Sequence, residues 1–593
     1  MRADRWLVGL IGVVAWWPSA IAADAGDLKP HPRLWWPASA EEQVKARIAA
    51  DPLAKEMNQA LVQRADKILG ERTCRYEIPD GKRLLAQSRL AIFHVTHTAW
   101  AWRMTGERKY FERCVAELDA ACGLKDWNPK HFLDTAEMAT AVATGYDWLW
   151  PNLSEEQRQN YARAIVDKAL RPAKAVYDKH DWWSRPGNNW SQVCGSGIAL
   201  AAAAIEEREP ALGRDLWDRG VKLVAGCHKF YEPDGCYPEG PGYWHYGTNY
   251  HVLLLAAAAS LDKEAPVPDV LQRSGDFIIQ MTGSSGLPFN FADAHAGRSE
   301  FTAAQAWIAG HFHDAGQAAR LRARLAAGPG GGKPFSEDRF APLELLWLPP
   351  EPRQGAPQLP VAALFGGEQA VAALRTAWSD DAVSLAVKGG TPAVNHGHMD
   401  VGSFVYDAHR TRWIHDLGSD DYNLPGYFGG QRWNYFRLNS LSHNTLVIGG
   451  KLQDRKAAPC PVTSHRRDGS WSTVVFDLGP AYRGQADEVT RTVKFDHASG
   501  VAVVSDGITK PTGEVRWAVV TDAETAVAGR DVVLRKKGET VTLRRMDQGG
   551  GGWEVTDAKP PTAREKPNPG FRMVWFTVPA AAKIAIEVAL RPG

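Results

Sequence analysis

The proline-rich stretch Leu348-Pro349-Pro350-Glu351-Pro352-Arg353-Gln354-Gly355-Ala356-Pro357 divides the chain into two parts with different sequence patterns. Proline at this density favours an extended, semi-rigid connection over a helix or a strand. We therefore expect a linker over residues 348–360. With 593 residues, 44% of them hydrophobic and 23% charged, the chain is long enough to form several globular domains around it.

Before the linker, apolar residues recur at three- and four-residue spacing and alanine is abundant, which predicts helices. Ser154 and Gln157 form a plausible capping box for one of them. Short Gly/Pro/Asn connections between helices favour stacked helical hairpins, in a solenoid or an (α/α) toroid. No clear repeat favours a regular solenoid. Examples of the expected helices are residues 88–104, 135–150, 154–176, 196–204 and 247–261.

After the linker, apolar and polar residues alternate, and turn signals follow every 8 to 15 residues. This pattern predicts an antiparallel β-sandwich over residues 361–593. The expected strands include residues 383–388, 402–407, 412–417, 444–448, 471–477, 500–506, 516–521, 531–536 and 572–578.

The N-terminus has the pattern of a secretory signal peptide over residues 1–22. Arg2 and Arg5 precede an apolar run, and Ala20-Ile21-Ala22 offers a cleavage site. The run is too short to predict a membrane span, so we expect export to the periplasm or beyond. Seven cysteines without a CxxC spacing indicate no disulfide scaffold, although Cys114–Cys122 or Cys227–Cys236 could pair locally.

The composition limits the partners. Lys and Arg number 69 and Asp and Glu 68, so the net charge of +1 gives no reason to expect nucleic acid as a partner. Tryptophan, with 24 residues, outnumbers phenylalanine with 19 and tyrosine with 15. The excess either fills a large core or provides flat rings that cover sugar faces.

One segment combines several groups that bind metals or transfer protons, namely Asn395-His396-Gly397-His398-Met399-Asp400. The next two predicted strands form a hairpin, which would return Asp416 to the end that carries His398. His443 precedes a later strand. Two histidines and a carboxylate suit zinc, but histidines that only form hydrogen bonds in a cleft would show the same spacing.

Three segments of the helical part are further candidates. The loop from Pro238 to Tyr250 gathers aromatic residues, glycines and Glu239, and it either positions side chains for binding or packs as an aromatic corner. Asn188 and Asn189 open a helix, where capping is the default interpretation and contact with a carboxylate is the alternative. Asp134 and Glu137 lie one helical turn apart, as a catalytic pair or as capping and packing groups.

Together these segments resemble the heparinase II/III-like polysaccharide lyases and the alginate lyases that share their architecture. The resemblance covers nearly the whole chain after residue 22. It implies an N-terminal (α/α) toroid over residues 23–347, a C-terminal β-sandwich domain over residues 361–593, and a cleft between them. The segments that carry the resemblance are residues 127–138, 188–192, 239–246, 289–293, 395–400 and 437–445.

The resemblance also implies a reaction, the β-elimination of a uronic-acid-containing polysaccharide. Tyr243, with Tyr246 as second choice, and His396 would be the acid–base groups, while Asn188 or Asn189 would neutralise the uronate carboxylate. The family's metal site corresponds to His398, Asp416 and His443, which implies a structural Zn²⁺. The residues expected to contact the substrate are His131, Trp190, Glu239, Trp244, Tyr246, Tyr435 and Arg437.

Two other functions remain open on the sequence alone. A glycoside hydrolase on the same toroid would need two carboxylates, for which Asp134, Glu137 and Glu239 are the candidates. A non-catalytic glycan-binding protein could keep the fold without the chemistry. Retention of both candidate acid–base residues favours the lyase.

Overall fold

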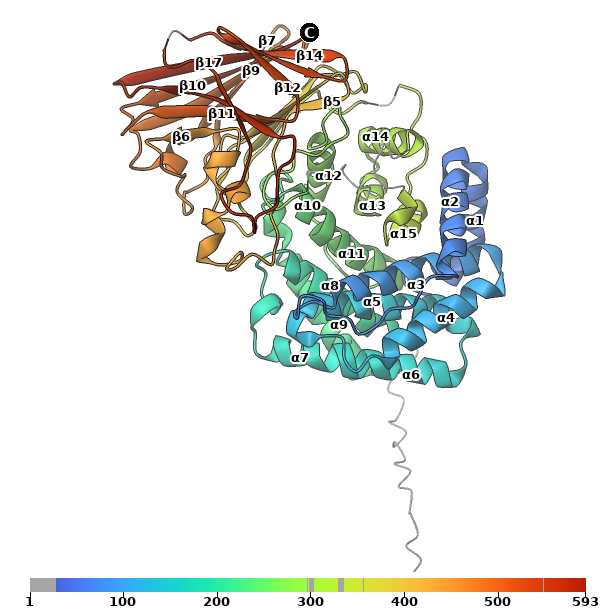
Figure 1. The fold of residues 1–593 in the computed structure, drawn as a ribbon. Coiled ribbons are helices and arrows are strands. Elements are labelled where there is room, and N and C mark those ends of the chain that lie inside the picture. Colours follow the sequence, from blue (N-terminus) through green and yellow to red (C-terminus); the bar gives the residue numbers. More distant parts are fainter. Residues whose placement is uncertain (1–27, 296, 298–302, 329–334, 356, 548) are drawn as a thin grey trace, which may run out of the picture.

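The computed structural model describes residues 28–295, 297, 303–328, 335–355, 357–547 and 549–593. Helices fill the chain up to Leu346, and strands begin at Ala362, so the change of structure falls at the proline-rich stretch (Figure 1). The predicted signal peptide lies outside the described residues. Within those residues, no helix is both long and apolar enough to span a bilayer.

The helices of the described part range from one turn to about six turns. They are α1 (Glu41–Ala50), α2 (Pro52–Ile68), α3 (Leu85–Thr105), α4 (Arg108–Gly123), α5 (Phe132–Leu149), α6 (Glu155–Ile165), α7 (Arg171–Asp178), α8 (Asn189–Ala204), α9 (Pro210–Ala225), α10 (Pro241–Tyr243), α11 (Asn249–Leu261), α12 (Val270–Gln280), α13 (Ala303–His311), α14 (Ala315–Ala326) and α15 (Ala341–Leu346).

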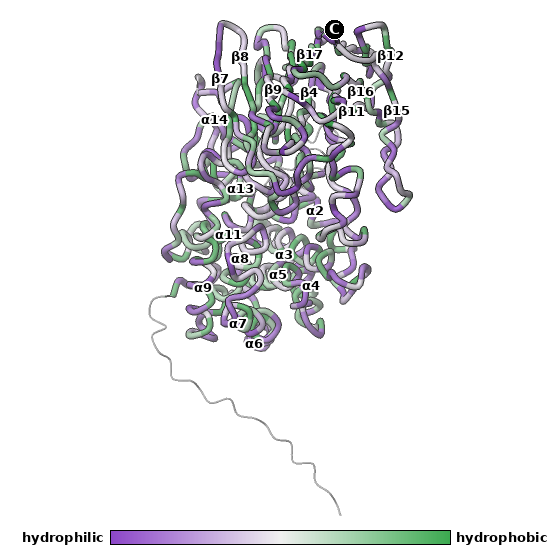
Figure 2. The backbone as a smooth tube through the Cα atoms, turned by 90° about the vertical axis from the view of Figure 1, so that its left-hand side faces the viewer, coloured by the Kyte–Doolittle hydropathy of each residue, from purple (hydrophilic) through white to green (hydrophobic). Residues whose placement is uncertain are grey.

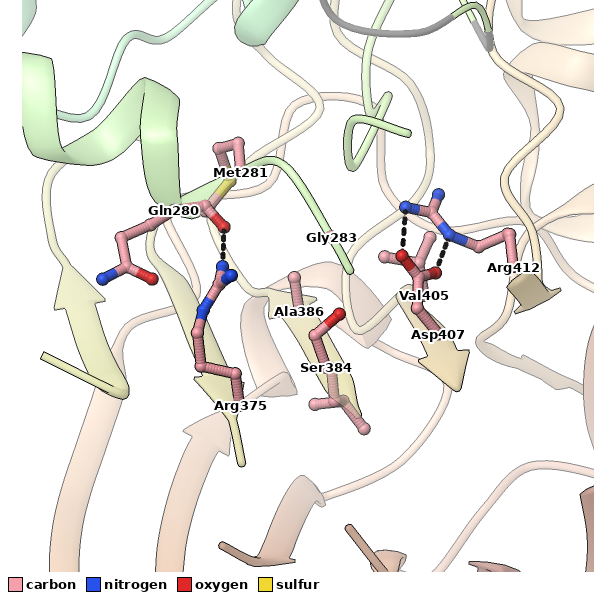
Figure 3. Close-up of a pocket in the computed structure, with 10 residues that line it drawn as sticks. Gln280, Met281, Gly283, Arg375, Ser384, Ala386, Val405, Asp407 and Arg412 are labelled. Carbon is pink, nitrogen blue, oxygen red and sulfur yellow. Dashed lines mark hydrogen bonds and ion pairs between the residues drawn. The ribbon is translucent and has the colours of Figure 1, made fainter. Parts of the chain in front are cut away.

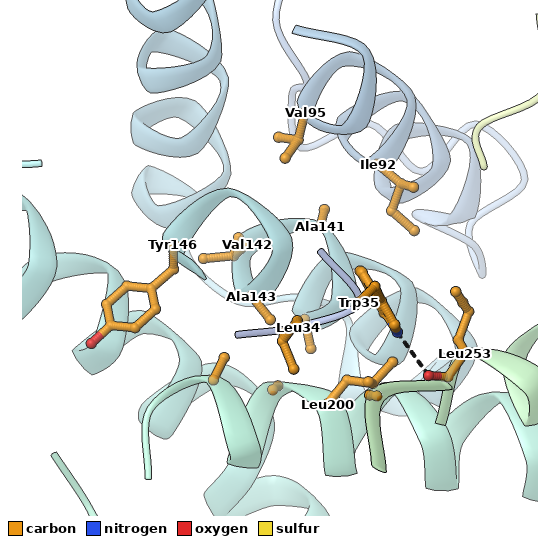
Figure 4. Packing of buried hydrophobic residues seen from close by; sticks show 14 of the residues in the cluster. Leu34, Trp35, Ile92, Val95, Ala141, Val142, Ala143, Tyr146, Leu200 and Leu253 are labelled. Carbon is orange, nitrogen blue, oxygen red and sulfur yellow. Dashed lines mark hydrogen bonds between the residues drawn. The ribbon is translucent and has the colours of Figure 1, made fainter. Parts of the chain in front are cut away.

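Helices α3, α5, α8 and α11 form the centre of the helical part. Every residue of α5 is buried, which requires neighbours on all its sides, and α3 and α8 pack directly against it. Figure 4 shows the resulting core, in which the segment before α1 is also enclosed. There Trp35 donates a hydrogen bond through Nε1 to the carbonyl of Leu253 at 2.8 Å, which ties the start of the described chain to α11.

The strands of the C-terminal part pair antiparallel throughout. They are β1 (Ala362–Phe365), β2 (Val371–Arg375), β3 (Ser384–Lys388), β4 (Phe404–Ala408), β5 (Thr411–Ile414), β6 (Leu446–Ile448), β7 (Val462–Asp468), β8 (Trp471–Asp477), β9 (Glu488–Asp496), β10 (Ala502–Thr509), β11 (Val515–Thr521), β12 (Glu524–Ala528), β13 (Asp531–Lys536), β14 (Glu539–Arg545), β15 (Glu554–Asp557), β16 (Arg572–Val578) and β17 (Lys583–Pro592).

These strands make three sheets. The first contains β1 to β5 in chain order, the second contains eight strands in the order β12-β13-β14-β17-β10-β9-β8-β7, and the third has the order β15-β16-β11-β6. Figure 2, turned by a quarter from Figure 1, again shows the sheets at one end of the molecule and the helices α5 to α9 at the other. The expected fold class, a helical part followed by antiparallel sheets, is therefore confirmed.

The five-stranded sheet is buried on both faces and joins the two parts. In β2, Val371 and Ala373 pack against a cluster that includes Phe277 of α12 and Trp244 of the helical part. Their neighbours in the same strand, Ala372 and Leu374, point the other way and belong to the core between the sheets. This sheet is thus a middle layer, and it fixes the loops at its ends against the helices.

The structure confirms one local prediction from the sequence and differs from others. Ser154 and Gln157 form the expected capping box at the start of α6. The single helix expected over residues 154–176 is wrong in one respect, because a π-helical segment, Val166–Leu170, separates α6 from α7. All seven cysteines are free, so the local pairings Cys114–Cys122 and Cys227–Cys236 do not form in this structure.

Candidate active site

Segments from both parts of the chain converge on His396, which lies in the loop between β3 and β4. Its backbone has a φ of +62°, a conformation that costs energy for a residue other than glycine and that is common at functional sites. Arg432 stabilises this turn by donating to the carbonyls of His396 and Gly397 at 2.9 and 3.0 Å. His396 is 9% exposed, so it is nearly enclosed by its neighbours.

Asp293, from the end of the helical part, orients the imidazole of His396. Its Oδ2 lies 2.7 Å from Nδ1 of His396. Its Oδ1 accepts hydrogen bonds from Tyr427 at 2.6 Å and from Arg432 at 2.9 Å. The same Oδ1 lies 3.0 Å from Nε2 of His398. Burial raises the pKa of Asp293, but the histidines and Arg432 outweigh it and hold this pKa well below its usual value. A carboxylate that binds Nδ1–H leaves Nε2 of His396 as the basic nitrogen.

Tyr243 stacks on His396, with ring centroids 3.8 Å apart and planes inclined by 15°. Its hydroxyl is 2.6 Å from the hydroxyl of Tyr422, which comes from the loop between β5 and β6. Burial and the charge of Asp293 raise the pKa of Tyr243, while the hydrogen bond with Tyr422 opposes the shift. Tyr243 is therefore a proton donor at neutral pH, and it lies in contact with a histidine that can accept.

Gly240 positions Tyr243 by allowing a tight turn before α10. Its φ is +84°, and a Cβ at this position would lie 2.8 Å from the carbonyl oxygen of Phe291. The chain can therefore approach the segment that carries Asp293 only with glycine at this position. A π-helical segment, Trp244–Thr248, follows at once, and such segments often occur at functional sites.

Asn189 and Glu239 form the other side of the site. The backbone N–H of Asn189 donates to Oε1 of Glu239 at 2.7 Å, and its side-chain amide donates to Oε2 at 2.5 Å. Asn395 donates to the same carboxyl group at 3.3 Å, and Nε2 of His396 lies 3.8 Å from it. Burial raises the pKa of Glu239, although the nearby charge of His396 and the amides lower it.

The two asparagines have different positions. Asn188 caps α8, because its side chain accepts a hydrogen bond from the N–H of Trp190 at 3.0 Å. Asn189 is 1% exposed, and its Oδ1 has no hydrogen-bond partner among the described residues. The capping interpretation therefore fits Asn188, and contact with a carboxylate fits Asn189.

Some of the residues expected to contact a substrate lie elsewhere. Trp244 is fully buried and donates to Ser274 at 2.7 Å, so the expectation that it contacts a sugar is wrong in this structure. Arg437 is part-exposed, and its guanidinium donates to the carbonyls of Leu417 and Ser419 at 3.0 Å and to the side chain of Asn568. It connects loops in this structure, and its contact with a substrate stays a prediction.

Of the other expected contact residues, Glu239 is buried, and the part-exposed ones are His131, Trp190, Tyr246 and Tyr435. Tyr435 donates to the carbonyl of Pro425 at 2.5 Å, within the loop that carries Tyr422. Trp190 packs edge-on against His131 at 4.9 Å, next to the start of α8. Trp182, which the sequence did not single out, packs against Trp190 with ring centroids 5.2 Å apart and planes inclined by 43°, and it is 43% exposed.

Two of the three carboxylates that are candidates for a hydrolase, Asp134 and Glu137, form contacts that stabilise the fold. Asp134 accepts from the N–H of Leu84 at 2.6 Å and from Asn128 at 2.7 Å, and it pairs with His131 at 2.6 Å. Glu137 is fully buried between arginines. Both groups therefore fit the capping and packing interpretation.

The predicted metal ligands lie close together, but they do not form a complete site. Nδ1 of His443 is 2.8 Å from Oδ2 of Asp416, and the rings of His398 and His443 are 5.4 Å apart. Nδ1 of His398 and Nε2 of His443 are buried without a hydrogen-bond partner. Across the described part of the chain, no group of three or more His, Cys, Asp or Glu side chains is arranged to hold a metal ion.

A separate small pocket lies away from these residues, between the end of α12 and the five-stranded sheet (Figure 3). There Arg375 donates to the carbonyl of Gln280 at 3.1 Å, and Arg412 pairs with Asp407. Both arginines also bind backbone carbonyls of the helical part, Arg375 that of Thr282 and Arg412 that of Pro288. We interpret this pocket as part of the contact between the two parts.

Sequence reasoning missed Asp293 and its partners Tyr427 and Arg432, and it missed Tyr422. Asp293 lay in a segment used for the resemblance, but nothing local showed that it would contact both histidines. Tyr422 lies in a long aromatic loop, and only folding brings its hydroxyl to Tyr243. The high density of aromatic residues between 422 and 436 is the sequence feature that could have indicated this loop as part of a binding site.

The C-terminal sequence of this chain is similar to a known family, and its fold is similar to that of solved structures. Residues 366–583 match the family model described as Heparinase II/III-like, C-terminal. A heparinase III structure aligns with a TM-score of 0.65 at 13% identity, covering 90% of this chain and 85% of that one. A mutant of the heparan sulfate lyase HepC from Pedobacter heparinus aligns with a TM-score of 0.59 at 15% identity, covering 94% and 87%.

A heparinase III with methylated lysines gives a TM-score of 0.60 at 16% identity, covering 94% of this chain and 89% of that one. No curated protein sequence matches the chain. At these identities the alignments establish the fold. The chain thus has the fold of heparinase III, and its residues 366–583 are similar to the heparinase II/III-like C-terminal domain.

Proposed function

We propose that this protein is an exported polysaccharide lyase that cleaves a uronic-acid-containing polysaccharide by β-elimination. The observation that carries the proposal is the stacked pair of Tyr243 and His396, with a proton donor in contact with an oriented base. The fold of heparinase III and the match of the C-terminal domain support it. The signal-like N-terminus supports export.

The reaction requires a base near C5 of the uronate and an acid near O4 of the bond that breaks. In the proposed mechanism Nε2 of His396 takes the C5 proton, because Asp293 holds the other nitrogen. The electrons of the C5–H bond form the C4–C5 double bond as the C4–O4 bond breaks. Tyr243 donates its proton to O4, and Tyr422 supplies a hydrogen bond to the tyrosyl oxygen that results.

Loss of the C5 proton builds negative charge next to the uronate carboxylate, which must be stabilised. The amide of Asn189 and the carboxyl of Glu239 supply hydrogen-bond donors for this purpose when Glu239 is protonated. Burial favours the protonated form of Glu239, since it raises the pKa of this group. A buried neutral carboxyl next to an asparagine is a suitable site for a carboxylate ligand.

The test is an assay with a panel of uronic-acid polysaccharides that follows the absorbance of the unsaturated product. We expect activity on at least one of them and a fall in kcat of about 10²-fold or more for Tyr243→Phe and for His396→Gln. Glu56→Gln, on exposed α2, serves as control. Absence of an unsaturated product across the panel would refute the proposal, and products without a double bond would indicate hydrolysis.

We also propose that zinc binds at His398 and His443. The support is that each imidazole binds a carboxylate through one nitrogen, Asp293 or Asp416, and leaves the other nitrogen buried and unpaired. Metal-ligating histidines commonly have such carboxylate partners. As placed, Asp416 is a partner of His443 and not a ligand. Zinc would brace the loops beside His396, and no step of the proposed reaction passes through it.

Metal analysis of the purified protein tests this second proposal. We expect about one zinc per chain, and His443→Ala should lose the metal and lower the melting temperature more than it alters chemistry. Folded, active protein without any divalent metal would contradict it.

A further inference from the structure

A buried carboxylate beside the candidate active site is paired with two arginines. Glu137 of α5 is fully buried, and it lies 3.0 Å from Nε of Arg89 on α3 and 3.2 Å from Nε of Arg339 before α15. Tyr250 donates a further hydrogen bond to it at 2.9 Å. Glu137 is shared between the two guanidinium groups, and the charge of Asp338 also acts on Arg339, so Arg89 is the arginine that is left without a carboxylate of its own.

The positive charge of Arg89 is accessible. Its side chain is 40% exposed, whereas that of Arg339 is 19% exposed. Within the described part of the chain, the guanidinium of Arg89 makes one hydrogen bond, from Nε to Glu137. The two terminal nitrogens, which form the edge that suits a bidentate anion, are therefore left available.

The guanidinium of Arg89 is held in position from two sides. Glu137 fixes its Nε, and the ring of Tyr246 lies against its face, with the guanidinium carbon 4.8 Å from the ring centroid. Arg339 approaches the same ring at 5.7 Å. A flexible surface arginine would lose more entropy on binding an anion, so this arrangement favours recognition.

The cluster lies next to Tyr243. Tyr246 follows Tyr243 by three residues along the same helical stretch, which places the two rings about one turn apart. The positive charge of Arg89 also acts on the phenol of Tyr243 and lowers its pKa, against the larger effect of burial. One helical turn is comparable with the length of one sugar unit.

We propose that Arg89, backed by Arg339 and Glu137, binds the acidic group of the sugar that neighbours the reacting uronate. The proposal rests on the proposed function, and it predicts a substrate with an anionic group on adjacent units. The acidic group is a carboxylate in a polymer of uronates or a sulfate in a sulfated alternating polymer. Both are anions that the open edge of a guanidinium recognises.

The experiment measures the Kd of oligosaccharides for the full chain carrying Tyr243→Phe, which prevents turnover. The probes are an oligouronate with carboxylates only, a sulfated uronate–hexosamine oligosaccharide and the same oligosaccharide after desulfation. We expect Arg89→Gln to raise the Kd of the probe with the matching anion by about tenfold or more, the loss of a charge-assisted hydrogen bond. The probe that responds identifies the anion.

Two further variants separate a loss of anion binding from a loss of folding and from the removal of any surface arginine. Arg89→Lys keeps the charge beside Glu137, so it should fold with an unchanged melting temperature and still weaken binding, because lysine lacks the bidentate edge. Arg410→Gln removes an exposed arginine that pairs with Asp380 at the far end of the β4–β5 hairpin, and it should leave Kd unchanged. In the otherwise unaltered enzyme, Arg89→Gln should raise KM with kcat within about threefold.

An equal Kd for all probes with and without Arg89→Gln would overturn the inference, as would a loss of kcat at unchanged KM. The proposed function can fail separately. If no polysaccharide yields an unsaturated product but binding of an anionic probe still depends on Arg89, the anion site stands and the lyase does not. If elimination proceeds and Arg89→Gln changes neither Kd nor KM, the lyase stands and the anion site does not.

Discussion

Single residues in the candidate site depend on partners that lie far away in the sequence. The asparagine pair and His396 could be recognised in the sequence because short motifs surround them. Asp293 and Tyr422 could not, because their importance arises only from contacts across more than one hundred residues. The predicted metal ligands show the same limit of what the sequence reveals about contacts. The sequence grouped His398, Asp416 and His443 as one set, but it could not show that Asp416 faces one histidine and Asp293 the other.

Asp293→Asn tests how His396 is oriented. An amide in place of the carboxylate can present a donor to Nδ1, which reverses the protonation of the imidazole and leaves Nε2 without its lone pair for catalysis. We expect kcat to fall by about 10²-fold or more, with a smaller change in KM. Near-UV circular dichroism should show an intact fold, and a variant with full activity would contradict this role.

Glu344 offers a prediction on stability and pH. This residue of α15 is fully buried, and both carboxylate oxygens lack a hydrogen-bond partner in the described structure. Burial, with the charge of Asp338, raises its pKa well above the usual value. The folded state therefore retains a proton that the unfolded state releases, so stability falls as the pH rises through the interval between the two pKa values.

Glu344→Gln removes that ionisation. We expect the variant to melt at least about 2 °C above the original protein at pH 8. The difference should shrink near pH 4.5, where about half of the unfolded carboxyl groups are also protonated. Thermal melts across this range check the sign, with Glu56→Gln as the exposed control. A variant that is less stable at pH 8 would show that the carboxylate is charged and paired.

At the scale of elements, the sequence pattern indicated some strands and left others unnamed. The strand expected over residues 471–477 coincides with β8, whose burial alternates along its length. Strands β1 and β2 were not expected, and all five residues of β2 are buried because its sheet has cores on both faces. Strand β7 was missed for the opposite reason, since nearly all of it is exposed and polar.

Close packing of helices also depends on single small residues. Gly197 of α8 faces α5, and a Cβ there would lie 2.7 Å from the carbonyl oxygen of Ala136. Gly197→Ala should therefore push the two central helices apart and lower the free energy of unfolding by about 1–3 kcal/mol. Chemical denaturation measures the loss. Gly123→Ala, where the same Cβ meets nothing within 4 Å, is the control.

At the scale of the whole molecule, the two parts are joined by a continuous apolar contact. The cluster that holds Phe277 and Trp244 also holds Phe365 and Val405 of the five-stranded sheet. In the sequence, the linker marks a boundary between two parts with different patterns. The structure instead makes the first sheet part of both cores, which a pattern read along the chain could not reveal.

This contact predicts cooperative unfolding. Because the middle sheet stabilises both neighbours, calorimetry should record one transition in which the helices and sheets melt together. Phe365→Ala should lower the melting temperature of that single transition, since it opens a cavity in the shared cluster. Two well-separated transitions, of which only one responds to the substitution, would show that the parts unfold independently.

The position of the acid–base pair at this junction has a consequence for biosynthesis. Tyr243 is translated well before His396, and Tyr422 follows both. A nascent chain that has completed its helices therefore lacks the proposed base, and the middle sheet that would hold it is not yet made. Under the proposed function, the cell that makes this protein is exposed to its chemistry only after nearly three quarters of the polypeptide has left the ribosome.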